Sequence, residues 1–212
     1  MDEELPKSNK GHRTRQRLLD AATFLVAENG RAALSVSAIC ERAEIGRTSF
    51  YNYFRDVDEI LDVVRRGTVE SFAAEFRNSH GTLPRGLKRL ARCLCLILFR
   101  AAQHPLWGRL VAELGMEDGG PPASFVEDVR LELEAARAAG SISLSPETCR
   151  TYATLLADAL FSRARHPRQG PADAVEVVRY VALLVTATGV GRDEAIRITE
   201  AALEEPDAAA AG

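Results

Sequence analysis

The sequence predicts an all-α protein, and three features lead to this prediction. Apolar residues recur at spacings of three and four through most of the 212 residues, as they do along one face of an α-helix. Segments containing Gly, Pro or Ser separate these stretches at distances typical of helix ends. A run of alternating apolar and polar residues, which would indicate a half-buried strand, is found nowhere in the chain.

Ten helices are expected from this periodicity. Several begin or end at a recognisable signal, such as the N-cap candidates Ser35, Asp56 and Ser145 and the stop at Asn29-Gly30. The expected ranges are about 14–29, 36–43, 47–54, 57–76, 85–103, 105–114, 123–139, 146–165, 172–188 and 192–203.

Charge is distributed unevenly along the chain. Residues 7–55 carry nine Lys and Arg against four Asp and Glu, whereas the whole chain has a formal net charge of −3. A basic head can approach phosphate groups while an acidic body stays away from them. The Gly- and Pro-containing segment 80–84 is the strongest break after the head. The predicted organisation is a disordered basic arm at 1–12, a head at 13–56, a helical body at 57–205 and a disordered tail at 206–212.

The segment 35–54, SVSAICERAEIGRTSFYNYF, predicts a helix-turn-helix. Gly46 allows a tight bend after the first helix, and Phe50 and Phe54 lie one turn apart on the inner face of the second. The outer face then carries hydroxyl, amide and guanidinium groups, which are the groups that read base edges in the major groove. The alternative is a small solvated helix whose tyrosines cover a neighbouring element.

Composition excludes several other classes of protein. The apolar run 93–99 is too short to span a bilayer, and the N-terminus lacks the apolar region of a signal peptide, so a cytoplasmic protein without membrane contact is expected. The cysteines lie at apolar helix positions, which favours buried free thiols over a redox switch. The four histidines have no partners at catalytic or metal-binding spacing, so neither an enzyme nor a cofactor or metal site is expected.

Residues 13–62 resemble the N-terminal DNA-binding domain of the tetracycline-repressor (TetR) family of bacterial transcriptional regulators. The resemblance rests on three stretches: the helix with Leu18, Ala22 and Phe24, the segment from Ser35 to Ile45, and Ser49-Phe50-Tyr51-Asn52-Tyr53-Phe54 followed by Asp58-Glu59-Ile60-Leu61. Beyond residue 80 it rests on helix number and length. The chain departs from the family at two positions, with Glu44 where Gly is usual and Val57 where a phosphate-binding Lys is usual.

The resemblance implies a homodimer that binds a double-stranded, pseudo-palindromic operator, with the helix at 47–54 in the major groove. The helices at 146–165 and 172–188 would form the dimer interface, where small residues permit close packing. The candidate DNA-binding residues are Ser35, Ser37, Arg47, Thr48, Ser49, Tyr51, Asn52 and Tyr53, together with Arg13 and Arg15 in the basic region and Arg55 as a replacement for the missing Lys.

The resemblance also implies that the body holds a small, largely apolar effector. The candidate ligand-binding residues are Phe72, Leu96, Phe99, Trp107, Phe125, Val129, Tyr152 and Leu156. An ordinary packed core is the alternative for any one of them. The alternatives for the whole chain are a helical protein-interaction module and a TetR-like regulator that lacks a small-molecule effector.

Overall fold

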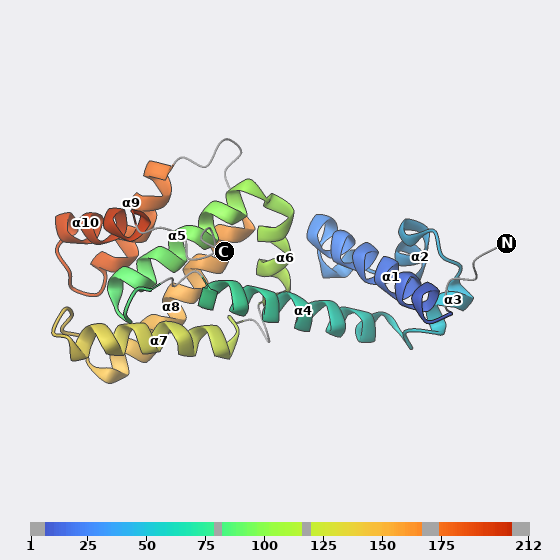
Figure 1. Ribbon diagram of the computed structural model, residues 1–212, viewed down its shortest axis with the longest axis horizontal. Coiled ribbons are helices and arrows are strands. Elements are labelled where there is room, and N and C mark those ends of the chain that lie inside the picture. The colour runs from blue at the N-terminus through green and yellow to red at the C-terminus, as the bar shows by residue number, and fades with distance from the viewer. Residues whose placement is uncertain (1–6, 79–81, 116–119, 167–173, 205–212) are drawn as a thin grey trace. The chain divides into compact units, whose positions relative to one another are not determined.

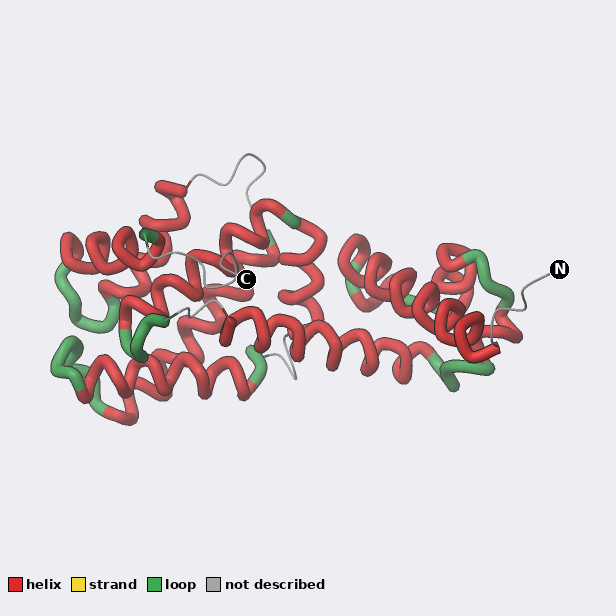
Figure 2. Tube along the Cα trace, viewed as in Figure 1, coloured by secondary structure: helices red, strands yellow, loops and turns green. Residues whose placement is uncertain are grey.

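The computed structural model of the protein describes residues 7–78, 82–115, 120–166 and 174–204. Within these ranges the chain forms helices and loops and no strand (Figure 2), which confirms the predicted all-α class. The predicted tail, half of the predicted arm and part of the break at 80–84 lie outside the described residues.

The helices follow the order predicted from the sequence (Figure 1), and most of their ends lie within a few residues of the expected positions. They are α1 (Lys7–Asn29), a short 3₁₀-helix η1 (Arg31–Ala33), α2 (Val36–Ala43), α3 (Arg47–Tyr51), α4 (Val57–Asn78), α5 (Leu87–Gln103), α6 (Pro105–Gly115), α7 (Ala123–Ala138), α8 (Pro146–Arg165), α9 (Ala174–Thr186) and α10 (Arg192–Leu203).

Two helix ends differ from the prediction. The first helix begins at Lys7, well before the expected start near residue 14, so the second half of the predicted disordered arm is helical. Only Gly11 interrupts this polar stretch, at a cost of about 1 kcal/mol relative to Ala. The helix α3 ends at Tyr51, before the expected end at Phe54, because the backbone N–H groups of Tyr53 and Phe54 both donate to the carbonyl of Phe50 (2.9 and 3.0 Å) and tighten the last turn.

The chain divides into two compact units, residues 1–68 and 69–212, and passes from one to the other inside α4. Ile60 and Leu61 near the start of this helix are buried within unit 1, whereas Phe72 and Phe76 near its end are buried within unit 2. The boundary therefore lies beyond the predicted change from head to body at residues 56 and 57.

Unit 1 is a small helical domain built on the apolar face of α1. Leu18, Ala22 and Val26 lie on that face and are fully buried, as expected for residues three and four apart on an amphipathic helix. Ile39 of α2 and Phe50 of α3 are also fully buried. The core of this unit thus holds the two helices of the helix-turn-helix against α1.

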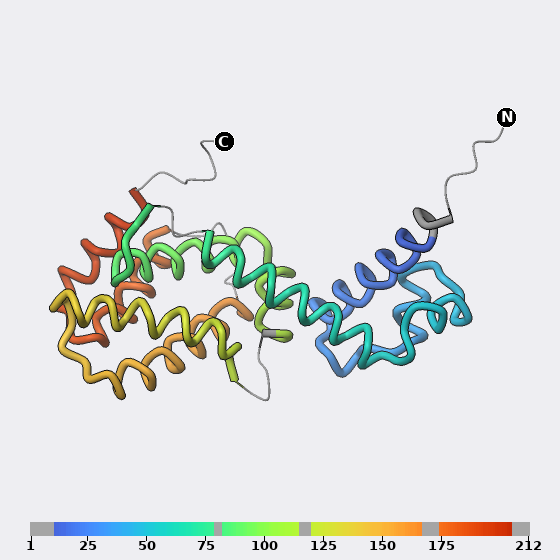
Figure 3. Tube along the Cα trace, turned by 60° about the horizontal axis from the view of Figure 1, so that its bottom comes forward, coloured from blue at the N-terminus to red at the C-terminus, as the bar shows by residue number. Residues whose placement is uncertain are grey.

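Unit 2 is organised around α5, which is apolar nearly all round and therefore must be surrounded. Ten of its residues are buried, and the helices α6, α7, α8, α9 and α10 all pack against it. The helices α7 and α8 also lie side by side (Figure 3). At Gly108 of α6 an added Cβ would stand 2.6 Å from the carbonyl oxygen of Ala164 in α8, so only glycine permits this close approach.

No helix among the described residues is long and apolar enough to cross a lipid bilayer.

Candidate nucleic-acid interface

Local interactions define the bend of the helix-turn-helix. The hydroxyl of Ser35 accepts a hydrogen bond from the backbone N–H of Ala38 (3.1 Å) and caps α2, as the sequence predicts. At the other end of α2, Glu44 adopts the left-handed conformation with φ 52° and ψ 46°. Its backbone N–H donates to the carbonyl of Glu41 (3.1 Å), which ends the helix.

The left-handed backbone explains why Glu44 is an unusual residue here. Among the described residues other than glycine it alone has a positive φ, and this conformation costs an L-residue with a Cβ about 1–2 kcal/mol. Glycine adopts it without that cost. The usual family residue therefore suits the backbone of this turn better than the residue that the chain carries.

Arg17 of α1 compensates in part for the glutamate, a role that sequence patterns did not predict. Its guanidinium donates to the carbonyl of Ala43 (2.5 Å) at the end of α2 and lies 3.5 Å from the Glu44 carboxylate. Both side chains are more than half exposed, so the ion pair itself contributes little to stability. The hydrogen bond to Ala43 satisfies a carbonyl that the helix leaves without a partner and ties α1 to the turn.

Glu44→Gly is expected to stabilise unit 1 by about 1 kcal/mol, because relief of the left-handed strain outweighs the loss of an exposed ion pair. It should also strengthen DNA binding, because a carboxylate is removed from the DNA-binding unit. Thermal unfolding and operator titration would measure the two effects. Glu44→Ala is the matched control: it removes the same carboxylate but keeps the Cβ, so it should not raise stability. Equal stability of the two variants would contradict this account.

The outer face of α3 brings most of the predicted DNA-binding residues together. Arg47, Thr48, Tyr51 and Asn52 are exposed, and Tyr51 has an exposed fraction of 59% despite its large ring. Beneath them Phe50 is fully buried, and its ring meets that of Tyr51 edge to face (5.5 Å between centroids). Buried Phe50 therefore fixes the rotation of α3 and turns the polar side chains outward. Of the other predicted contacts on this segment, Ser49 and Tyr53 are half-buried.

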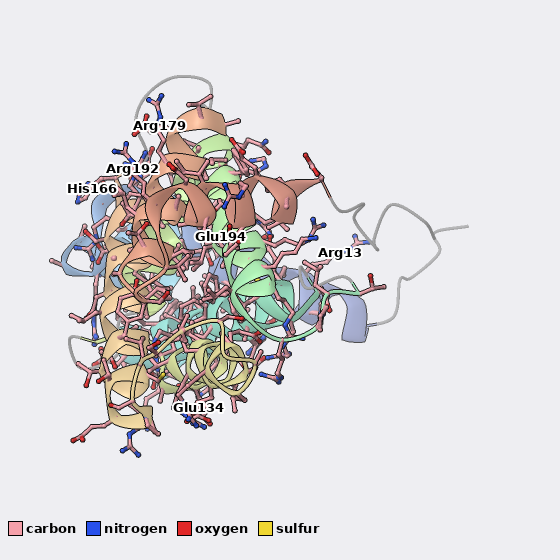
Figure 4. The ribbon with its side chains drawn as sticks, turned by 90° about the vertical axis from the view of Figure 1, so that its left-hand side faces the viewer. Arg13, Glu134, His166, Arg179, Arg192 and Glu194 are labelled. Carbon is pink, nitrogen blue, oxygen red and sulfur yellow. The ribbon has the colours of Figure 1, made fainter. Side chains whose placement is uncertain are left out.

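The remaining candidates have different surroundings. Ser37 accepts a hydrogen bond from the Arg47 guanidinium, so the two residues form one polar group. The hydroxyl of Ser35 is engaged in capping α2. The Arg15 guanidinium lies over the ring of Phe54, 5.3 Å from its centroid, whereas Arg13 on the same helix is exposed and extends outward (Figure 4).

Arg55 lies at the position that could replace the missing Lys at the start of α4. Its Nε donates to the carboxylate of Asp56 (2.9 Å), and its side chain remains largely exposed. The backbone N–H of Glu59 also donates to this carboxylate (2.8 Å), so Asp56 caps α4 as predicted. Both hydrogen bonds lower the pKa of Asp56, and the one from Glu59 has the larger effect.

In unit 2 the predicted ligand-binding aromatics form part of a close-packed cluster. The ring centroid of Phe72 lies 5.1 Å from that of Phe125 and 6.4 Å from that of Trp107. Phe161 and Phe76, which were not among the candidates, complete the cluster through contacts with Phe125 at 5.6 and 4.8 Å. Their helical spacing alone could have included them.

The other ligand-binding candidates are distributed more widely. Val129 and Leu156 are fully buried in the core of unit 2, and Leu96 and Phe99 are half-buried. The hydroxyl of Tyr152 donates to the carbonyl of Leu184 in α9. Burial raises the pKa of Tyr152 to about 12, so the hydroxyl stays protonated as a donor.

The cysteines behave as small apolar residues. Cys40, Cys93, Cys95 and Cys149 are all buried free thiols, which confirms the interpretation from the sequence. Burial raises the pKa of Cys95 to about 12, and it also raises the pKa of Cys40, although the nearby Arg47 opposes this shift. A thiol that stays protonated is a poor nucleophile.

The fold and the exposed polar face of α3 define a helix-turn-helix DNA-binding protein. Residues 18–64 match the sequence model described as "Bacterial regulatory proteins, tetR family". The chain thus carries the DNA-binding domain of this family, which confirms the resemblance found in residues 13–62. It is a DNA-binding transcriptional regulator and not an enzyme.

Solved structures share the fold over nearly the whole chain. RolR in complex with resorcinol is 20% identical, with a TM-score of 0.59 over 94% of this chain and 97% of that one. A γ-butyrolactone receptor described as ArpA-like is 13% identical, with a TM-score of 0.68 over 93% and 100%. A tetR-family regulatory protein from Rhodococcus RHA1 is 15% identical, with a TM-score of 0.68 over 84% and 98%. At these identities the similarity establishes the fold of unit 2 but not a ligand.

Proposed function

We propose that the protein is a ligand-responsive repressor that binds a pseudo-palindromic operator as a homodimer. The observation that carries this proposal is the outer face of α3, where Arg47, Thr48 and Tyr51 are exposed on a helix held by buried Phe50. Asn52 is exposed directly after the end of this helix. Two such helices in a dimer would enter successive major grooves about 34–36 Å apart, one turn of DNA.

Contacts with the DNA backbone would come from residues around α3. Tyr51 and Tyr53 present hydroxyl groups, and Arg13, Arg15 and Arg55 carry positive charge that can neutralise phosphates. Thr48, Ser49 and Asn52 are suited to base edges, together with Arg47 and its hydrogen-bond partner Ser37. Ser35 contributes through its cap, which sets the start of α2.

Homodimerisation is proposed to use α8 and α9. Three large apolar side chains on these helices are exposed in the single chain: Leu155 (58%), Val175 (53%) and Leu183 (66%). Exposed apolar area of this kind, concentrated on two neighbouring helices, supports an interface with another protein surface. A two-fold dimer would cover both faces with the same pair of helices.

Effector binding is proposed to involve the aromatic cluster of unit 2. Small-molecule sites are lined mainly by apolar and aromatic side chains, so this cluster has the chemistry to hold a small apolar or aromatic molecule. Two of the similar structures are of RolR with resorcinol and of a γ-butyrolactone receptor, so small phenols and lactones are the first compounds to test. Because α4 carries Ile60 into unit 1 and Phe72 into unit 2, displacement of this helix by an effector can alter DNA binding, with a coupling of about 1–3 kcal/mol.

The test is a titration of the protein with DNA from upstream of its own reading frame, over a range of salt concentrations. Specific binding that weakens steeply with salt is expected, and an effector should release it. Trp107 is the single tryptophan of the chain, so a change in its fluorescence on adding resorcinol or γ-butyrolactone would report binding within unit 2. DNA binding without any effector response would favour a regulator that lacks a small-molecule ligand. No DNA binding at low salt would favour a protein-interaction module.

A further inference from the structure

The charges that flank the exposed face of α8 and α9 have no partner in the described part of the chain. Asp158 of α8 is half-buried and Arg179 of α9 is exposed, and neither takes part in an ion pair within the described residues. Figure 4 shows Arg179 at the outer surface of unit 2. Each of the two lies beside one of the exposed leucines, Leu155 and Leu183.

Two hydrogen bonds fix the relative positions of these charges along the helices. The Tyr152 hydroxyl donates to the carbonyl of Leu184, and the Tyr180 hydroxyl donates to the carbonyl of Ala159 (2.8 Å). The two helices are therefore antiparallel neighbours, and residues 159 and 180 lie at the same height along the helix axes. Asp158 and Arg179 directly precede these two residues, so they also lie at nearly the same level.

Helical geometry places the two charges on opposite outer edges of the exposed face. On α8, Asp158 is about 60° around the helix from Leu155, on the side away from Ala159, which faces α9. On α9, Arg179 is about 40° from Leu183, on the side away from Tyr180, which faces α8. Within one chain, Asp158 and Arg179 therefore lie on opposite sides of the helix pair, with both helices between them.

A second copy of the chain brings them together. In this arrangement α8 packs on α9 of the partner, so the two-fold axis must be parallel to the four helices. An axis perpendicular to the helices would instead pack α8 on α8 of the partner. Rotation about this axis leaves the height of every residue along the helices unchanged. It also places the outer edge of α8 against the outer edge of the partner's α9. Asp158 then faces the partner's Arg179, and the symmetry repeats the contact a second time.

We propose that Asp158 and Arg179 form two reciprocal ion pairs across the dimer and that these pairs select a second copy of this chain as the partner. The inference rests on the proposed dimer through α8 and α9. At the edge of an interface an ion pair adds little affinity, whereas like charges brought face to face disfavour a wrong partner. The leucines would thus hold the dimer, and the two charges would determine which chains associate.

Charge reversal tests the contact. In a homodimer of Asp158→Arg, or of Arg179→Asp, like charges would meet at both positions, so each variant alone should dissociate at least tenfold more readily in sedimentation experiments at low salt. An equimolar mixture of the two should form a heterodimer as stable as the unmodified dimer, because opposite charges then meet at both positions. The double variant Asp158→Arg/Arg179→Asp should also dimerise normally. Arg66→Asp, at an exposed position of α4 within unit 1 and on neither α8 nor α9, is the control and should have no effect.

Leucine variants separate this inference from the proposed interface. Leu155→Asp and Leu183→Asp should both yield monomers if the dimer uses α8 and α9. If they do while the charge-reversed variants dimerise normally, the ion pairs are absent although the interface is correct. Failure of the mixture to restore the dimer would likewise overturn the pairing. If neither the leucine nor the charge variants change the association, the proposed interface itself is wrong.

Discussion

Tyr51→Phe is expected to weaken operator binding about ten- to hundredfold. The hydroxyl projects from an exposed position on α3, where it can donate to a phosphate oxygen. A hydrogen bond to a charged group is worth about 1.5–3 kcal/mol, and each 1.4 kcal/mol corresponds to a factor of ten in affinity. Because phosphate contacts carry no sequence information, the loss should be similar on the operator and on variants of its sequence.

The phenylalanine variant separates this effect from misfolding. It keeps the ring that meets Phe50 edge to face, so the thermal unfolding of unit 1 and the association of the dimer should not change. Fluorescence anisotropy with labelled operator DNA would measure the affinity. Asn52→Ala provides the comparison, since loss of an amide that reads a base edge should reduce discrimination between operator sequences. An unchanged affinity of the Tyr51→Phe variant would remove this hydroxyl from the interface.

Local signals made most of the fold predictable. Ser35 and Ser145 were predicted to begin helices, and in both cases the hydroxyl accepts from a backbone N–H in the first turn. The many apolar positions of α5 predict burial on nearly all sides, and the helix is surrounded. These predictions succeeded because capping and periodicity depend on residues within one or two turns of each other.

The less predictable features depend on residues that are far apart in the sequence. Arg17 contacts Ala43 only because α1 and α2 pack together, and no spacing rule connects the two positions. The aromatic ring of Tyr152 suggested a ligand contact, but its hydroxyl has a backbone acceptor in another helix. The sequence predicts a start of α1 that is too late, because polar residues give no periodic signal although they have adequate helix propensity.

The buried carboxylate of Glu132 is the clearest feature of this kind. This residue of α7 has an exposed fraction of 1%. Its carboxylate accepts hydrogen bonds from the backbone N–H of Gly86 (2.9 Å), from Arg89 Nε (3.0 Å) and from Arg85 (3.3 Å). The carboxylate therefore caps the beginning of α5 from a different helix and binds two cations there.

Glu132→Ala is expected to destabilise unit 2 by about 3–5 kcal/mol. Removing one member of a buried ion pair leaves the other charge without compensation, and the side chain of Arg89 is only 13% exposed. The backbone N–H of Gly86 loses its acceptor at the same time. Chemical denaturation followed through Trp107, which lies in unit 2, would measure the change.

Glu127→Ala on the same helix is the matched control. Its carboxylate also binds an arginine, Arg130 (2.7 Å), and this hydrogen bond lowers the pKa of Glu127. The Glu127 side chain is exposed, however, so water can replace the arginine and stability should hardly change. Similar effects of the two substitutions would show that the number of ion pairs on α7 matters more than their burial. A large loss of stability in Glu132→Ala but not in Glu127→Ala would show that the buried carboxylate of Glu132 joins α5 to α7. Of these two carboxylates, it is the one that is buried and accepts hydrogen bonds from three donors at the start of α5.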